Sequence, residues 1–192
     1  MQECSLTARE LACRRGDRLL FRGLELALVP GDAIHIAGPN GIGKSSLMRI
    51  LAGLMQPYAG SVERTGSIGL VDERPALDEH APLGKALGFW QRIDGAADNE
   101  FARLGLADLL DVPVRYLSTG QRKRAAFARL LGQSAPIWLL DEPLNGLDRD
   151  AVALVERIVA EHYHGGGIAV IASHQAIAIE GGKTVAIEDF AK

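Results

Sequence analysis

Residues 38–45 read Gly38-Pro39-Asn40-Gly41-Ile42-Gly43-Lys44-Ser45 and fit the pattern G-x-x-x-x-G-K-[ST] without a mismatch. Glycines lack a Cβ, so the backbone of such a segment can turn tightly around an anion and point its N–H groups inward. Lys44 adds a full positive charge, and Ser45 supplies a hydroxyl that can ligate Mg²⁺. The segment therefore predicts a site for the phosphates of a triphosphate.

The flanking residues place this loop between a strand and a helix. Residues 33–37 form a short, mostly apolar run that is typical of a buried strand. After the loop, apolar residues recur at helical spacing, at Leu47, Ile50, Leu51 and Leu54. A helix that begins here directs the positive end of its dipole toward bound phosphates. A plain glycine-rich turn remains the alternative, and this order of elements argues against it.

Length and charge limit the class of protein. The chain has 192 residues, enough for one sizeable core, and a net charge of −3 with no run of Lys and Arg. This predicts neither a nucleic-acid groove nor a polybasic membrane patch. The apolar runs are far shorter than the ~20 residues that span a bilayer, and the start does not resemble a signal peptide, so we expect a soluble, cytosolic chain. The only cysteines, Cys4 and Cys13, lack C-x-x-C spacing and are expected to stay reduced.

The chain predicts a small β layer, then a helical insert, then buried strands. Strand-like runs at 6–12 and 19–28 flank the turn signal Gly16-Asp17, which is typical of an antiparallel hairpin, and residues 67–71 are another strand candidate. Helical spacing replaces alternation from 82 to 132, as in Leu83, Leu87 and Trp90 and again in Leu104, Leu106, Leu109 and Leu110. Buried strands are predicted at 137–140, 168–172 and 184–187, with an amphipathic helix over 151–159.

The predicted strand at 137–140 ends in two carboxylates, Asp141 and Glu142. If this strand lies beside the one that leads into the phosphate loop, Asp141 can hold Mg²⁺ opposite Ser45. Glu142 projects differently and can accept a proton from an attacking water. On the pattern alone, an acidic strand end that merely faces solvent remains the alternative.

A second candidate anion site opens the helix that follows Leu117. Ser118 is a good N-cap residue, and Arg122 to Leu131 alternates basic and apolar positions in a helical manner. Free N–H groups, the Ser118 hydroxyl and the helix dipole converge there without a lysine, so the site can grip a phosphate that is held elsewhere. An ordinary capped helix is the alternative.

Together these motifs resemble an ATP-binding cassette (ABC) ATPase, and the match covers nearly the whole chain. The resemblance implies an α/β P-loop NTPase fold with a RecA-like core, an N-terminal antiparallel β layer and a helical subdomain insert. It implies one domain over residues 1–192, with the core at 1–73 and 136–192 and the helical subdomain at 74–135.

The resemblance also implies ATP and Mg²⁺ as cofactors and assigns residues to them. ATP would lie on residues 38–46, from Gly38 to Ser46. Mg²⁺ would be held by Ser45 and Asp141. Glu142 and His174, the latter resembling the family's switch histidine, would be catalytic. Two copies would close head to tail, so that the signature residues of one copy cap ATP on the other. These residues are Ser118, Thr119, Gly120 and Gln121, joined by Asp148, which resembles a dimer-bridging aspartate.

Three positions depart from the family pattern. Arg15 stands where an aromatic side chain usually stacks on adenine, and its guanidinium plane can still stack there. Thr119 replaces the first glycine of the signature. Glu73 stands at the switch-glutamine position, where its carboxylate can ligate Mg²⁺ but adds negative charge beside the phosphates.

A narrower resemblance is to the ATP-binding subunit of the haem exporter used in bacterial cytochrome c maturation, carried by Leu11-Ala12-Cys13-Arg14, the run 18–21 and the compact length. It implies a peripheral subunit on the cytoplasmic face of the inner membrane, bound to integral membrane permease subunits, with no direct haem binding. We expect docking near 73–77, with Phe89 and Trp90 as candidate contacts. The alternatives are a soluble ABC-type ATPase that acts on nucleic acid or ribosomes, and a regulatory module that binds ATP without turnover.

Overall fold

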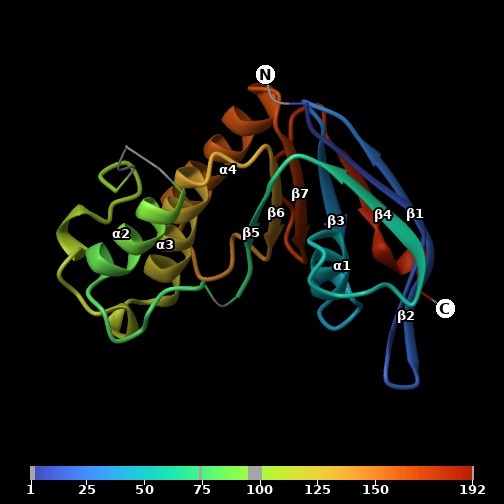
Figure 1. Cartoon of the computed structure of the whole chain (residues 1–192), viewed down its shortest axis with the longest axis horizontal. Coiled ribbons are helices and arrows are strands. Elements are labelled where there is room, and N and C mark those ends of the chain that lie inside the picture. The colour runs from blue at the N-terminus through green and yellow to red at the C-terminus, as the bar shows by residue number, and fades with distance from the viewer. Residues whose placement is uncertain (1–2, 74, 95–100, 192) are drawn as a thin grey trace.

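The computed structural model describes residues 3–73, 75–94 and 101–191, which form two sheets and a group of helices (Figure 1). The larger sheet is parallel, in the order β5 (Ile68–Val71), β6 (Ile137–Asp141), β7 (Ile168–Ser173), β3 (Ala33–Ala37) and β8 (Lys183–Ala186). The α-helices are α1 (Lys44–Leu51), α2 (Leu83–Asp94), α3 (Thr119–Gly132) and α4 (Arg149–His164). The predicted parallel strands are confirmed to within a residue at each end, and their carboxyl ends lie along one edge of the sheet.

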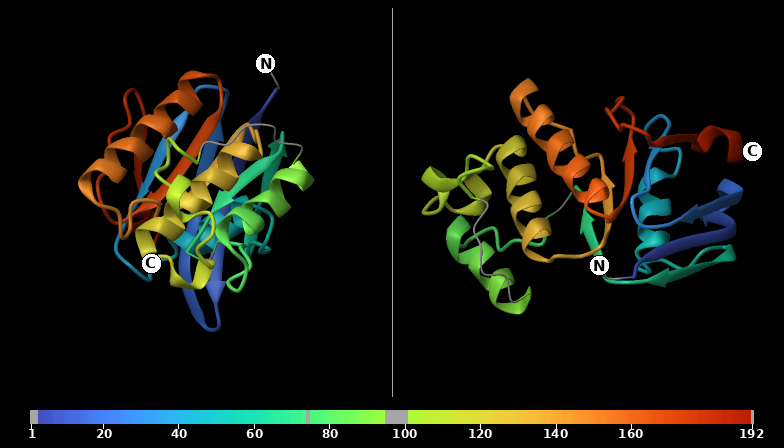
Figure 2. Two further views of the ribbon diagram at one scale, coloured as in Figure 1. Left: turned by 90° about the vertical axis from the view of Figure 1, so that its left-hand side faces the viewer. Right: turned by 90° about the horizontal axis from the view of Figure 1, so that it is seen from above.

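Alternate side chains of the parallel sheet enter two hydrophobic cores. Ile137 and Leu139 of β6 pack with α1 and the smaller sheet, whereas Trp138 and Leu140 pack with α3 and α4. Both faces are covered, which explains why β6 reads as a continuous apolar run without alternation. Figure 2 shows α1 between the two sheets when the molecule is seen from above.

The smaller sheet is antiparallel, in the order β2 (Arg18–Leu28), β1 (Ser5–Arg15) and β4 (Ala59–Thr65). The predicted hairpin is confirmed, with Arg15 paired to Arg18 at its tip. The sequence did not predict β4, because its side chains are exposed except for the half-buried Val62 and show no usable alternation. Pairing with β1, as in Thr7 with Glu63, holds β4 in place.

Two of the helical predictions need correction. Helix α1 ends at Leu51, and Leu54, which was expected on its buried face, is 68% exposed. Gly53 ends the helix with a φ of 77°, a left-handed conformation that glycine adopts without strain. The spacing at 104–110 also gives no α-helix, because Gly105 with a φ of 62° interrupts the chain there.

Segment 101–117 instead contains two short 3₁₀ helices, η1 (Ala107–Leu109) and η2 (Val114–Tyr116), and a third, η3 (Ile187–Phe190), follows β8. Leu104 and Leu106 are nevertheless fully buried in the core beside α3. Residues 95–100 of the predicted helical insert lie outside the described residues. Within the described ranges, none of the helices has the length and apolar character needed to cross a membrane.

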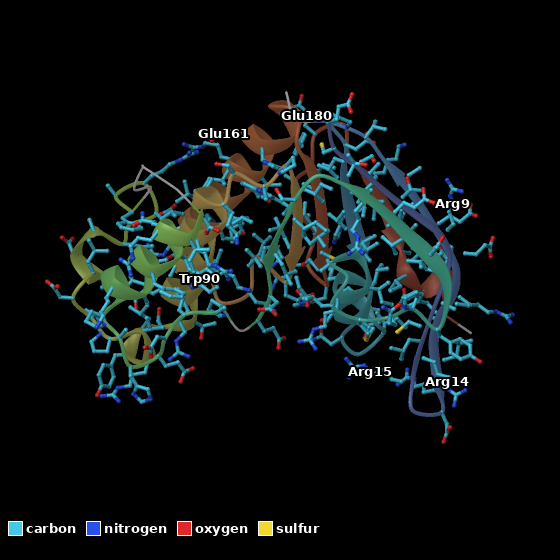
Figure 3. The ribbon with its side chains drawn as sticks, in the orientation of Figure 1. Arg9, Arg14, Arg15, Trp90, Glu161 and Glu180 are labelled. Carbon is cyan, nitrogen blue, oxygen red and sulfur yellow. The ribbon has the colours of Figure 1, made fainter. Side chains whose placement is uncertain are left out.

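Trp90 joins α2 to its surroundings. Its Nε1 atom donates a hydrogen bond of 2.6 Å to the Ala76 carbonyl, and the Arg129 guanidinium of α3 lies 3.6 Å from the centre of its ring. Figure 3 labels Trp90 where it points from α2 toward α3. These contacts assign Trp90 to packing within the helical part of the chain.

The end of α4 packs on the parallel sheet through a stacked pair of rings. The imidazole of His162 lies parallel to the indole of Trp138, with ring centres 3.7 Å apart, and its Nε2 atom lies 3.3 Å from the Ile168 carbonyl oxygen. Burial lowers the pKa of His162 from the ordinary value of 6.5, although the hydrogen bond to Ile168 opposes this shift. The folded protein therefore favours the neutral ring.

This shift predicts how stability depends on pH. Since the pKa of His162 is lowered on folding, its neutral form contributes stability above the ordinary value of 6.5, and that contribution is lost as the pH falls through the lower, folded value. We expect His162→Phe, which keeps a ring on Trp138, to reduce the fall in free energy of unfolding between pH 7.5 and 5, measured by urea denaturation. His164→Gln, in the same turn but exposed, should keep the parent slope. Equal slopes in parent and His162→Phe would contradict this account.

Candidate active site

The phosphate loop connects β3 to α1 and presents open backbone N–H groups. A Cβ at Gly41 would meet no atom within 4 Å, and the φ of Gly41 is 78°. At Gly43, with a φ of 124°, a Cβ would lie 3.2 Å from Leu20 and 3.3 Å from Phe21, so this position tolerates little beyond hydrogen. Gly43 is also the N-cap of α1, and no side chain caps the helix there. The loop thus leaves uncapped N–H groups at a positive helix end, the usual form of an anion site.

Lys44 is buried at the centre of this loop. Its Nζ atom donates hydrogen bonds of 2.7 Å to the Gly38 carbonyl and 3.2 Å to the Pro39 carbonyl. The same atom lies 3.1 Å from the Glu142 Oε1 atom, and both side chains are less than a tenth exposed. The loop carbonyls and the carboxylate together compensate a buried cation.

Glu142 is held in a strained backbone conformation. Its φ is 47°, in the left-handed region that costs a non-glycine residue on the order of 1 kcal/mol or more. Its backbone N–H donates to the Ala172 carbonyl at 2.8 Å. His174 contacts its carboxylate twice, through Nδ1 at 2.9 Å and through its backbone N–H at 3.2 Å. Strained residues cluster where a side chain must be aimed, and this one is aimed at Lys44 and His174.

Asp141 is buried at the end of β6 with an unsatisfied oxygen. Among the described residues, its Oδ1 atom has no hydrogen-bond partner. Burial raises the pKa of Asp141, while a hydrogen bond with the Ser45 side chain lowers it. A buried, unpartnered carboxylate oxygen beside a hydroxyl is an oxygen ligand set of the kind that Mg²⁺ prefers, so these residues fit the metal.

The strand order differs from the one assumed for this pair of motifs. β6 does not lie beside β3, because β7 pairs with both of them. Asp141 and Ser45 still meet, since β3, β6 and β7 are parallel and end at the same edge of the sheet. Ligand sites of open α/β sheets lie outside this edge.

A cavity of about 540 Å³ lies over the loop. Its walls are formed by residues of the loop, of the hairpin and of the acidic strand ends: Arg15, Arg18, Leu20, Asn40, Gly41, Gly43, Lys44, Ser45, Ser46, Glu73, Glu142 and Asn145. Figure 3 labels Arg15 near the loop end of α1. The sequence interpretation did not include Arg18 or Asn145 as site residues. The predicted turn at Gly16-Asp17 could have pointed to Arg18, because a hairpin with this turn pairs Arg18 with Arg15.

The residues of the second anion site lie elsewhere. Ser118 caps α3 in a full capping box, in which its Oγ accepts from the Gln121 N–H at 3.2 Å and its own N–H donates to the Gln121 side chain at 2.8 Å. The N-cap prediction is therefore confirmed. A Cβ on Gly120 would lie 2.7 Å from the Gly146 carbonyl oxygen, so the two turns are closely packed.

The signature residues do not line the 540 Å³ cavity of their own chain. Thr119 lines a second cavity of about 330 Å³, which it shares with Glu73, Glu142 and Asn145.

The two remaining predicted site residues lie in a helix cap and in the loop. Asp148 caps α4 by accepting a hydrogen bond of 2.8 Å from the Ala151 N–H. Ile42 belongs to the loop, where its side chain would lie 3.2 Å from a Cβ on Gly38.

Comparisons with known proteins identify the family of this chain. The profile of the family described as ABC transporter matches residues 21–145. The chain is 60% identical over 190 residues to the cytochrome c biogenesis ATP-binding export protein CcmA of Novosphingobium aromaticivorans, covering 99% of each chain. It is 53% identical over 173 residues to the protein of the same name from Sphingopyxis alaskensis, covering 88% of this chain and 89% of the relative.

A solved structure supports the fold. A Pyrococcus furiosus protein described as an ABC transporter ATP-binding protein superposes with a TM-score of 0.82 over 98% of this chain and 100% of that chain. The sequence identity is 21%, so this likeness bears on the fold alone. The predicted α/β P-loop fold is confirmed.

The open space at Gly41 gives a test of the phosphate loop. We expect Gly41→Val to abolish binding of a fluorescent nucleoside triphosphate, because a β-branched residue cannot keep the left-handed conformation and would redirect the loop N–H groups. The matched control is Gly181→Val, since Gly181 has a similar φ of 70° and also no neighbouring atom within 4 Å. Both changes should cost about 1–3 kcal/mol of stability, measured by thermal unfolding. Equal nucleotide affinity in the two variants would refute the loop assignment.

Proposed function

The chain belongs to the ABC transporter family, and we propose that it is the ATP-binding and ATP-hydrolysing subunit of an exporter that serves cytochrome c biogenesis. As a member of this family it is an ATPase. One observation carries the proposal for this chain: Glu142 is fixed between Lys44 of the phosphate loop and His174, at the edge where the parallel strands end. A cation for phosphates and a base for water thus lie side by side.

Lys44 and Glu142 have linked roles in this reaction. While Lys44 is paired with Glu142, the ammonium group occupies a carboxylate oxygen that would otherwise be available to water. Phosphates bound on the loop offer Lys44 a second anion and weaken its hold on Glu142. His174 then remains to orient the carboxylate, which accepts a proton from the attacking water.

The acidic strand ends provide for a metal ion. Ser45 and Asp141 would hold Mg²⁺, with Glu73 as a further candidate ligand that lines the same cavity as Ser45. When bound, Mg²⁺ neutralises phosphate charge and polarises the phosphoryl oxygens. The buried Asp141 Oδ1 atom, which lacks a partner, supports this assignment.

Arg15 and Arg18 would contact the nucleotide at the hairpin end of the 540 Å³ cavity. Their guanidinium planes can stack on a base, as proposed for Arg15 from the sequence, and their charges favour phosphates. Tyr58, an exposed aromatic residue before β4, does not line this cavity, and the Arg14 guanidinium lies 5.5 Å from the centre of its ring. We therefore assign the base platform to arginine in this chain.

The signature residues would act on a second copy of the chain. Ser118 to Gln121 form a capped helix start with no lysine, outside the phosphate cavity of their own chain. In a head-to-tail dimer they would cap ATP on the partner. Asp148, at the start of α4, would lie between the two copies. The same reading divides the chain into a core at 1–73 and 136–192 and a helical subdomain at 74–135.

Membrane subunits would complete the transporter. We place the chain at the cytoplasmic face of the inner membrane, with haem as the cargo of the assembly and no direct haem contact by this chain. Phe89, which is 51% exposed on α2, is the better candidate for the docking surface, because Trp90 packs against Arg129. Co-purification from native membranes would identify the attached subunits.

Glu142→Gln tests the proposed base. The change keeps the shape of the side chain but removes its basicity, so we expect ATP hydrolysis to slow by about a hundredfold or more while ATP still binds. The variant should accumulate as an ATP-bound dimer in size-exclusion chromatography. Glu63→Gln, on the exposed strand β4, is the control and should hydrolyse ATP at the parent rate. Parent-like turnover by Glu142→Gln would remove Glu142 from the role of base.

Ser118→Asp tests the dimer. Aspartate caps a helix as well as serine does, so α3 should keep its stability, but its charge would repel the partner's ATP. We expect ATP to bind to the Ser118→Asp monomer with parent affinity, while ATP-dependent dimers disappear in light scattering. The isosteric Ser118→Asn variant should still dimerise. If Ser118→Asp dimerises as readily as Ser118→Asn, the signature residues do not face a phosphate.

A further inference from the structure

Carboxylates crowd the catalytic edge of the sheet. β5 and β6 pair in parallel with Val71 opposite Leu140, so the residues that follow each strand lie at the same edge of the sheet. These are Asp72 and Glu73 after β5, and Asp141 and Glu142 at the end of β6. Asp72, Glu73 and Glu142 line the cavity of about 330 Å³ between this edge and α3. Like charges that line one cavity repel one another, and a cation at the same cavity offsets this repulsion.

Lys123 of α3 lines the same cavity and is only 7% exposed. Burial lowers its pKa, and the charge of Asp141, followed by those of Asp72, Glu73 and Glu142, opposes that shift. Arg122 also lines the cavity, but its guanidinium donates a hydrogen bond of 2.6 Å to the Arg115 carbonyl. Lys44, a further cation near Glu142, is bound to the phosphate loop. A buried ammonium persists only beside compensating charge, and here the carboxylates supply it.

We propose that Lys123 is a positioning residue of the ATPase site: a fixed counter-charge on α3 that offsets the carboxylates of the catalytic edge and allows a glutamate at position 73. This inference rests on the proposed function, since it concerns how the site receives nucleotide and metal. Lys123 is five residues after Ser118, so a positive charge near the start of α3 faces the acidic edge across this cavity.

The affinity of the site for nucleotide and its affinity for a divalent cation should change in opposite directions when this charge is lost. Without Lys123 the edge is more negative, so it repels the nucleotide and attracts a divalent cation more strongly. If the residue merely supported the fold, its loss would weaken the binding of both ligands. The sign of the two changes therefore separates a counter-charge from a packing role.

The experiment measures each ligand without the other. Binding of a fluorescent ATP analogue is followed by anisotropy in EDTA, and binding of Mn²⁺ is followed by electron paramagnetic resonance in the absence of nucleotide. For Lys123→Met we expect nucleotide affinity about tenfold lower and Mn²⁺ affinity about tenfold higher than in the parent, as for one charge removed at short range. Lys123→Arg should stay within about twofold of the parent for both ligands.

Two further variants serve as controls. Arg124→Met removes a charge from the next position of α3, but the Arg124 side chain points to the Leu104 carbonyl, at 3.1 Å, and both affinities should stay near the parent values. Lys123→Met with Glu73→Gln removes one charge of each sign, and should restore nucleotide affinity to within about threefold of the parent. If Lys123→Met does not fold, this balanced double variant carries the test.

The results decide between the readings. Nucleotide and Mn²⁺ affinities that fall together in Lys123→Met, or that do not change, would overturn the proposal, as would a double variant no better than Lys123→Met. If Lys123→Met does not fold, a double variant with nucleotide affinity tenfold below the parent would overturn it too. A parent chain that fails to bind nucleotide at all would instead overturn the proposed function.

Discussion

The buried ion pair between Lys44 and Glu142 is the interaction on which the site depends. The two charged atoms lie 3.1 Å apart, and both side chains are less than a tenth exposed. Removing either partner would leave an uncompensated buried charge, which proteins rarely tolerate. The pair exists because β3 and β6 are parallel and end at the same edge, with β7 between them. The sheet therefore brings together a loop and a carboxylate that lie far apart in the sequence.

The same edge concentrates strain and charge, which suits a site that changes on binding its ligand. Glu142 has a left-handed backbone, and the buried Asp141 Oδ1 atom lacks a partner. Both features cost stability on their own. A cation would satisfy the Asp141 Oδ1 atom, and phosphates would offer Lys44 a second anion beside Glu142. Under the proposed function, ATP and Mg²⁺ would therefore bind at the residues assigned to hydrolysis.

Local signals predicted much of the fold and of the site, and tertiary effects account for the rest. The phosphate loop, the buried strands and the Ser118 cap are each encoded within a few neighbouring residues, and the structure contains all three. β4 was missed because pairing with β1, not its own pattern, keeps it in the sheet. No sequence motif indicates that β7 lies between β3 and β6, because the order of the strands is set by the topology of the whole sheet. Lys123 and Asn145 reach the site only because α3 and the turn before α4 fold over the acidic edge.

The most direct test of the central claim is a crystal structure of the chain with Mg²⁺ and a non-hydrolysable ATP analogue. We predict that the triphosphate lies on the loop N–H groups, that the Lys44 Nζ atom has left Glu142 for the terminal phosphates, and that the metal lies on Ser45 and Asp141. A nucleotide bound elsewhere, or a Lys44 to Glu142 distance still at 3.1 Å with nucleotide on the loop, would contradict the account.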